Sequence, residues 1–304
     1  MKKILRLVVL LALPASAGAA ETAAFLKIGV GARAAAMGGA YTSVADDASA
    51  VGWNPAGPAA LSKREIGATH TELTSDTRFD FLSFAQPVKH GVISAAGAYL
   101  SQGRISGRDV NGAPTGGYSA SDMSVALGFA SQAAADLKLG VNAKYIQSSI
   151  AEASAQSGAL DLGGQYVLKG LRGPGVPVIG VAVQNLGPAM KFLDQSSQLP
   201  LTFAAGIGYR FPAGSIVALD YKGRPHSRDS DFSIGTEYAL LSNFALRAGY
   251  GTAKAYSGDK AVLTALNGFS MGFGIKLSAY SLDYSFAPAG ELGNVQTLSF
   301  GAKF

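Results

Sequence analysis

Residues 278–286 read Ser-Ala-Tyr-Ser-Leu-Asp-Tyr-Ser-Phe, an alternation of apolar and small or polar residues that indicates the fold class. The two tyrosines, Leu282 and Phe286 share one parity, whereas the serines and Asp283 occupy the other. Because successive side chains of a β-strand point to opposite faces, the segment predicts a strand with one apolar and one polar face.

The same alternation recurs along most of the chain. Segments 137–145, 201–211 and 269–277 repeat it, and each confines its charged residues to one parity. These segments are longer than the roughly five to six residues of most globular strands. A basic side chain on a lipid-facing position would destabilise the barrel by about 2–4 kcal/mol. This cost explains why one of the two sets of alternating positions carries no charged residue. The sequence therefore predicts an all-β fold, a transmembrane antiparallel β-barrel.

The predicted barrel has about 14 strands, an even number that lets a single chain close antiparallel. Parity is weakest near 64–87 and 176–186. The expected spans are 64–72, 78–87, 91–102, 120–131, 135–148, 157–169, 176–186, 199–211, 214–223, 230–240, 243–252, 267–277, 279–288 and 294–304.

The connections between these spans alternate in length. Short turns follow every second strand, whereas 103–119, 186–198 and 253–266 form longer connections. Short turns at one end and longer loops at the other are typical of outer-membrane barrels, with the short turns in the periplasm. The last strand carries Phe300 and ends on Phe304, a pattern that resembles the signal read by outer-membrane assembly machinery.

Residues 1–20 predict a secretory signal peptide. Lys2, Lys3 and Arg6 precede a short apolar run, and small residues follow it. The run is far shorter than the ~20 apolar residues that a membrane helix needs. We therefore expect export, signal-peptide cleavage after Ala17, Ala19 or Ala20, and residence in the outer membrane.

Residues 21–62 lack the alternation and are rich in glycine and alanine. A barrel of about 14 strands has an interior too wide for its own side chains to fill. We expect this segment to form a hatch inside the lumen, followed by the barrel over 63–304. The chain has no cysteine, which excludes a disulfide scaffold and thiolate zinc sites, and it has only three histidines. Part of its net charge of +5 lies in the signal peptide, so no basic surface for nucleic acid is indicated.

The hatch also carries motifs. The run Gly-Ala-Arg-Ala-Ala-Ala-Met-Gly-Gly-Ala-Tyr at 31–41, the run Ala-Asp-Asp-Ala-Ser at 45–49 and Trp-Asn-Pro-Ala-Gly at 53–57 resemble the start of PorV/PorQ-family outer-membrane proteins. That family is related to the FadL-type transporters of long-chain fatty acids. The resemblance implies a 14-stranded barrel with an N-terminal hatch, and a role in hydrophobic transport or in type IX protein secretion.

The hatch residues Arg33, Asp46, Asp47, Trp53, Asn54 and Pro55 are our first candidate site. The Asn-Pro-Ala-Gly run favours a tight turn, with a ligand contact as the alternative. The two aspartates either pair with Arg33 inside the barrel or cap a helix that faces water.

The second candidate site is a set of charges on the lumen parity. They either pair across the interior and anchor the hatch, or line an ion path in a polar porin. These residues are Lys144, Asp161, Arg210, Asp220, Lys222, Glu237, Arg247 and Asp283.

Three functions remain open. The first is a non-enzymatic barrel of PorV/PorQ type that acts in transport or secretion. The second is a FadL-like channel for hydrophobic small molecules such as long-chain fatty acids. The third is a lipid hydrolase, for which His226 beside Ser227 is the best candidate. Adjacent strand residues point oppositely, so this pair disfavours a catalytic dyad.

We predict no enzyme, and hence no catalytic residues. We expect no cofactor, no metal site and no nucleic-acid partner. The expected partners are outer-membrane lipid, the assembly machinery, and either secreted cargo proteins or hydrophobic small molecules.

Overall fold

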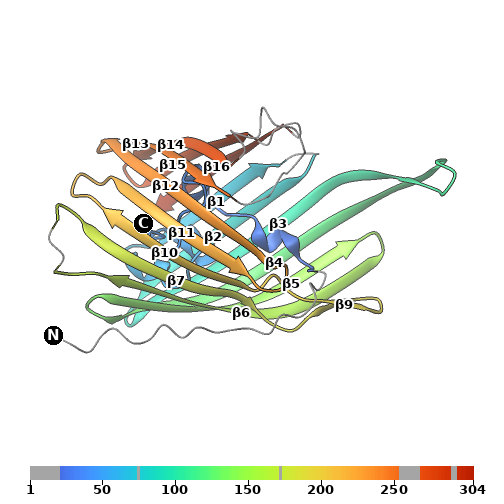
Figure 1. Cartoon of the computed structure of the whole chain (residues 1–304), viewed down its shortest axis with the longest axis horizontal. Helices are drawn as coiled ribbons and strands as arrows, with labels where there is room; N and C mark the ends of the chain where they lie inside the picture. Colours follow the sequence, from blue (N-terminus) through green and yellow to red (C-terminus); the bar gives the residue numbers. More distant parts are fainter. Residues whose placement is uncertain (1–20, 74–75, 171–172, 253–267, 289–292) are drawn as a thin grey trace.

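The computed structural model describes residues 21–73, 76–170, 173–252, 268–288 and 293–304 (Figure 1). The predicted signal peptide, 1–20, and the whole of the expected loop 253–266 lie outside these ranges. Among the described residues, no helix has both the length and the apolar character needed to cross a bilayer.

Fourteen strands form one closed antiparallel barrel, as the sequence predicts (Figure 1). The first strand closes on the last, with Glu65 opposite Lys303 and Glu72 opposite Gln296. The barrel strands are β1 (Glu65–Glu72), β2 (Arg78–Val88), β3 (Gly91–Arg108), β4 (Pro114–Ala134), β5 (Leu137–Ile150), β6 (Ala153–Val167), β7 (Val176–Leu186), β10 (Thr202–Arg210), β11 (Ile216–Arg224), β12 (Asp229–Leu241), β13 (Phe244–Gly251), β14 (Phe269–Leu277), β15 (Tyr280–Pro288) and β16 (Asn294–Lys303).

The prediction of a long loop over 103–119 is wrong. Strand β3 continues to Arg108 and β4 begins at Pro114, so most of the segment is a ladder in which Ile105 faces Tyr118. This ribbon projects beyond the rest of the barrel (Figure 1). Its glycines and serines carry no apolar parity, but the hydrogen bonds of a β-ladder join backbone groups and do not require one.

The connection 187–201 also contains structure that the sequence did not indicate. Strands β8 (Met190–Phe192) and β9 (Gln195–Ser197) form a separate two-stranded sheet that packs on β6. The three-residue strands are too short for a parity signal. All other strand bounds lie close to the predicted spans, including the weak β1, β2 and β7.

The two faces of the barrel wall differ in chemistry as the alternation predicts. Leu82, Leu127 and Leu219 lie on the outer face, exposed by 63%, 65% and 49%. On the inner face, Asp161 and Asp220 are buried at 0% and 1% exposure. The apolar residues of each strand therefore form the surface that meets hydrocarbon, and the polar residues line the lumen.

An outward-facing polar pair interrupts this pattern on β1 and β2. His70 Nδ1 lies 2.7 Å from an Asp80 carboxylate oxygen, and both side chains are about half exposed. The neighbouring pair Glu72 and Arg78, also exposed, lies closer to the strand ends. These residues explain why parity is weak in this part of the sequence.

The segment before β1 fills the lumen. It comprises η1 (Ala24–Lys27), α1 (Ala32–Ala36), η2 (Ala48–Gly52) and η3 (Gly57–Ala60). The short helix α1 packs against β13 to β16, whereas η3 packs against β3 to β6. Tyr41 and Met37 are fully buried. Alanine and glycine suit this segment because the space between opposite walls admits a backbone but few large side chains.

Candidate functional site

Arg33 of α1 joins the hatch to the barrel wall. Its Nε and Nη2 donate to the two carboxylate oxygens of Glu237 on β12, at 2.7 and 3.0 Å. Its Nη1 donates to Asp46 at 2.6 Å and to the Tyr41 hydroxyl at 3.0 Å. The planar guanidinium thus holds two parts of the hatch against one strand, in the bidentate geometry that favours arginine over lysine.

The network extends along the wall from both ends of Arg33. Glu237 also accepts from Arg247 Nε at 2.6 Å, and Arg247 Nη1 donates to Asp283 at 2.6 Å. Asp46 accepts from Arg210 Nη1 at 2.6 Å. Through Arg210, Glu237, Arg247 and Asp283 of the wall, this network ties the hatch to β10, β12, β13 and β15.

This environment changes the acid–base behaviour of the hatch residues. Burial alone would raise the pKa of Asp46, but the guanidiniums of Arg33 and Arg210 outweigh it and hold that pKa well below its ordinary value. Burial raises the pKa of Tyr41 well above its ordinary value, although Arg33 opposes the shift. At neutral pH Asp46 is ionised and Tyr41 is a neutral donor, whose hydroxyl lies 2.6 Å from Asp47.

The Asp220 side chain binds backbone N–H groups of the hatch. One carboxylate oxygen of Asp220 accepts the N–H groups of Tyr41 and Thr42 at 2.9 and 2.7 Å. Two strand positions further, Lys222 Nζ lies 4.1 Å from the centre of the Trp53 ring and donates to the Gly39 carbonyl at 3.3 Å. Strand β11 thus holds two separate parts of the hatch.

The Trp-Asn-Pro-Ala run forms a turn that is also anchored to the wall. Asn54 Oδ1 accepts from the Ala56 N–H at 3.0 Å, as in an Asx turn. Its Nδ2 donates to the carbonyls of Thr42 and Gly164, the latter on β6. Trp53 Nε1 donates to the Val30 carbonyl at 2.7 Å, and Pro55 packs on the inner face of the wall beside Gly140.

Lys144 and Asp161 make a contact within the wall. Lys144 Nζ lies 2.7 Å from Asp161 Oδ2 and 2.9 Å from Asn185 Oδ1. Asp161 Oδ1 accepts the Asn185 N–H, at the point where the register of β6 and β7 shifts. These side chains bridge strands where the backbone ladder is irregular. Of the eight lumen charges in our candidate set, this pair, like Arg247 and Asp283, makes no direct hydrogen bond or ion pair to the hatch in the described residues.

Several uncharged residues that our sequence analysis did not single out also bind the hatch. Gln165 Nε2 donates to the Ala45 carbonyl at 2.9 Å, and Asn142 Nδ2 donates to the Val51 carbonyl at 2.9 Å. Ser270 Oγ donates to the Ala36 carbonyl and accepts from Gly38 N–H. Their shared signal is an amide or hydroxyl on the lumen parity, which is too common in barrels to be diagnostic.

A cavity of about 480 Å³ lies in the lumen between the hatch and the longer connections. Its apolar surface comes from Leu26, Ile28 and Trp53 of the hatch and from Leu73. Each lining cation has a partner: Lys27 pairs with Glu21, Arg224 pairs with Asp231 at 2.5 Å, and Lys222 contacts the Trp53 ring and the Gly39 carbonyl. The cavity thus combines an apolar surface with cations that already have partners, which suits an uncharged or weakly polar molecule.

His226 and Ser227 form no hydrogen-bonded pair among the described residues. His226 Nδ1 donates to the Leu199 carbonyl at 2.9 Å, and Ser227 Oγ is buried with no hydrogen-bond partner in this part of the chain. Within the described ranges, no three His, Asp or Glu side chains gather as metal ligands would.

The assembly-signal candidates lie on the last strand. Phe300 is on the outer face opposite Ala68 and Leu282, and its ring stacks on Tyr280 at 5.8 Å. Phe304 follows β16 and is exposed.

Comparison with solved structures places this architecture among known barrels. The toluene transporter TodX of Pseudomonas putida superposes with a TM-score of 0.60 at 15% identity, over 90% of this chain and 96% of that one. The monoaromatic hydrocarbon channel CymD gives 0.63 at 14% identity, over 94% and 99%. The chain has the fold of these outer-membrane barrels. A TodX variant named deltaS2S3 gives 0.62 at 15% identity, over 91% and 99%.

Sequence comparison is less informative. The model of the Uncharacterised protein family (UPF0164) matches residues 16–161. No curated protein sequence matches the chain. At such low identity, the similarity to TodX and CymD establishes the outer-membrane barrel fold, whereas a function has to be argued from the lumen.

Proposed function

We propose that the protein is a non-enzymatic outer-membrane channel for the uptake of hydrophobic small molecules. The observation that carries the proposal is the 480 Å³ cavity above the hatch, with its apolar lining and with a partner for each cation that lines it. Pockets of this size range hold small ligands. The partners of Lys27, Lys222 and Arg224 leave no cation of this cavity without a contact, which disfavours a site for ions.

The similarity to TodX and CymD supports this function, because those proteins are described as a toluene transporter and a monoaromatic hydrocarbon channel. It favours the channel over the PorV/PorQ-type secretion role. Secretion remains a prediction from the hatch motifs alone. It predicts that exported proteins with a sorting domain co-purify with the barrel, and recovery of only assembly machinery from solubilised membranes would argue against it.

The test is uptake of a labelled hydrophobic molecule by cells that carry or lack the protein. Labelled toluene and labelled oleate cover the short aromatic and the long-chain classes. We expect faster uptake of at least one of them with the wild-type protein, and unchanged uptake of sucrose. Equal uptake of both probes by the deletion strain would contradict the proposal.

A matched pair of variants connects uptake to the cavity. Ala287→Trp places an indole on the inner face of β15, where Ala287 lines the cavity. Ala248→Trp places the same group on the outer face of β13, where Ala248 is exposed. We expect Ala287→Trp to reduce uptake to the level of the deletion strain and Ala248→Trp to leave it unchanged.

A further inference from the structure

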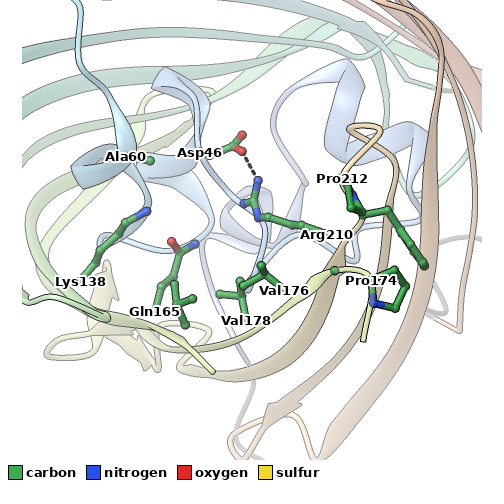
Figure 2. A pocket seen from close by; sticks show the side chains of 12 residues that line it. Asp46, Ala60, Lys138, Gln165, Pro174, Val176, Val178, Arg210 and Pro212 are labelled. Carbon is green, nitrogen blue, oxygen red and sulfur yellow. Dashed lines mark hydrogen bonds and ion pairs between the residues drawn. The ribbon is translucent and has the colours of Figure 1, made fainter. Parts of the chain in front are cut away.

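A second cavity lies at the opposite end of the lumen, beside the short turns. Its volume is about 600 Å³. Pro174 and Pro212 belong to the connections that follow β6 and β10, and Asp46 and Ala60 belong to the hatch (Figure 2). Short turns face the periplasm in outer-membrane barrels, so this cavity opens on the side away from the 480 Å³ cavity.

Two cationic side chains line the cavity. They are Lys138 of β5 and Arg210 of β10, and the lining carboxylate is Asp46 of the hatch (Figure 2). Both oxygens of Asp46 already accept from a guanidinium, Oδ1 from Arg33 and Oδ2 from Arg210. Among the described residues, Lys138 makes no hydrogen bond and no ion pair, although it lies within electrostatic range of Asp46. Its three ammonium donors thus remain available at the cavity surface.

The wall between these two cations is apolar. Val167 of β6 and Val178 of β7 line it, because β6 and β7 lie between β5 and β10 in the barrel. Pro174 and Pro212 of the short connections also line the cavity (Figure 2). Gln165 lines it too, but its amide is held by the Ala45 carbonyl of the hatch. A ligand would therefore find an apolar surface flanked by two cationic side chains.

We propose that this cavity is a binding site for a small amphiphile with one anionic head, a carboxylate or a phosphate, on a short apolar body. The head contacts the Lys138 ammonium, with the Arg210 guanidinium adding to the positive field, and the apolar body packs on the two valines and the prolines. This site is separate from the 480 Å³ cavity, where each lining cation already has a hydrogen-bond or ion-pair partner. It does not depend on the uptake function proposed above.

Binding is tested with octanoate as the probe and full-length protein in nanodiscs of phosphatidylcholine, where the probe is the only anionic amphiphile. Octan-1-ol and octylammonium have the same chain with a neutral or a cationic head. Equilibrium dialysis, corrected for empty nanodiscs, gives the affinities. We expect saturable binding of octanoate and not of octylammonium, and weaker binding of octan-1-ol.

Variants identify the site. Lys138→Met should weaken octanoate binding about tenfold, because a charge-assisted hydrogen bond is lost, and should leave octan-1-ol unchanged. Lys89→Met removes a lysine from an exposed turn at the same end of the barrel and should change neither. Val178→Trp should abolish octanoate binding by filling the cavity. Far-ultraviolet circular dichroism and heat-modifiable migration check that each variant is folded.

A photoreactive octanoate that carries a diazirine on its terminal carbon gives a readout independent of the variants. We expect labelled peptides from 165–178 or 210–212. Labelling confined to 24–28 and 222–233, which line the other cavity, would overturn the proposal. Equal affinities of wild type and Lys138→Met for octanoate would also overturn it, whatever the outcome of the uptake experiments.

Discussion

Arg33 shows how single residues hold the hatch in the lumen. Its guanidinium divides its donors between Glu237 of the wall and Asp46 and Tyr41 of the hatch. A buried charge is tolerated when each donor finds an acceptor, and it becomes costly when one partner is removed. The strength of this anchor therefore depends on keeping the whole network intact.

Glu237→Gln tests the anchor. The substitution keeps the shape of the side chain but leaves Arg33 and Arg247 to share an uncharged partner. We expect the free energy of unfolding to fall by about 3 kcal/mol, as for other buried pairs that lose one charge. Urea unfolding in detergent micelles measures it. Asp229→Asn, an exposed position on the same strand, is the control. A loss equal to that of the control would mean that the network does not stabilise the fold.

The ionisation of Asp46 predicts a pH dependence. Its pKa in the folded protein is held well below the ordinary value, after burial has been outweighed by Arg33 and Arg210. A lowered pKa stabilises the folded state above the unfolded pKa of about 4, and the contribution is lost as the pH falls toward the folded pKa. The stability difference between wild type and Asp46→Asn should be constant from about pH 8 to 5 and shrink below about pH 4.

Unfolding in urea at a series of pH values provides this comparison, with the exposed Glu152→Gln as a matched control. A difference that widens on acidification would contradict the role of the Asp46 carboxylate.

At the scale of elements, the hatch and the strands fit because glycines occupy the inner face where the hatch backbone approaches. A Cβ added to Gly180 of β7 would lie 2.4 Å from the Thr42 carbonyl oxygen, and one added to Gly249 of β13 would lie 2.1 Å from Met37. Both contacts are with backbone atoms, which cannot rotate away. The glycines on the lumen parity therefore set the distance between hatch and wall.

Gly180→Ala is expected to displace the hatch or strain β7, at a cost of about 1–3 kcal/mol from overpacking. Gly97→Ala on β3 is the matched control, because a Cβ there meets nothing within 4 Å. The difference between the two variants in resistance of the hatch to limited proteolysis gives a second readout. Identical behaviour of both variants would show that the close approach has no consequence for the hatch.

At the scale of the whole molecule, two systems of contacts coexist. The barrel is closed by its own backbone ladder from β1 to β16, which involves no residue of the hatch. The hatch contributes Tyr41, Met37 and Trp53 to the buried core inside that ladder. Closing the sheet satisfies the backbone in lipid, whereas filling the lumen decides what passes through it.

Deletion of residues 22–62 should separate these systems. We expect the barrel still to insert and to migrate as a heat-modifiable β-protein, because its ladder is complete. In planar bilayers it should conduct more current than the wild-type protein, since the plug is absent. Failure to insert, with the wild type inserting normally, would show that the hatch is required for assembly. An inserted barrel of unchanged conductance would contradict the plugged lumen.

Alternation along the chain was enough to predict the strand number, the antiparallel closure and the division between an apolar outer face and a polar lumen. Those properties follow from the alternation of side chains between the two faces of a strand. This alternation can be seen in each strand without knowing which strands lie beside it. The partners of Arg33, the Lys222–Trp53 contact and the side-chain bridge at Asp161 were decided only by the tertiary structure. Closing the barrel brings strands distant in sequence around one segment, so Glu237 meets Arg33 across 204 positions. The two cavities have the same origin, because each is the space that the hatch leaves between walls whose separation no single strand encodes.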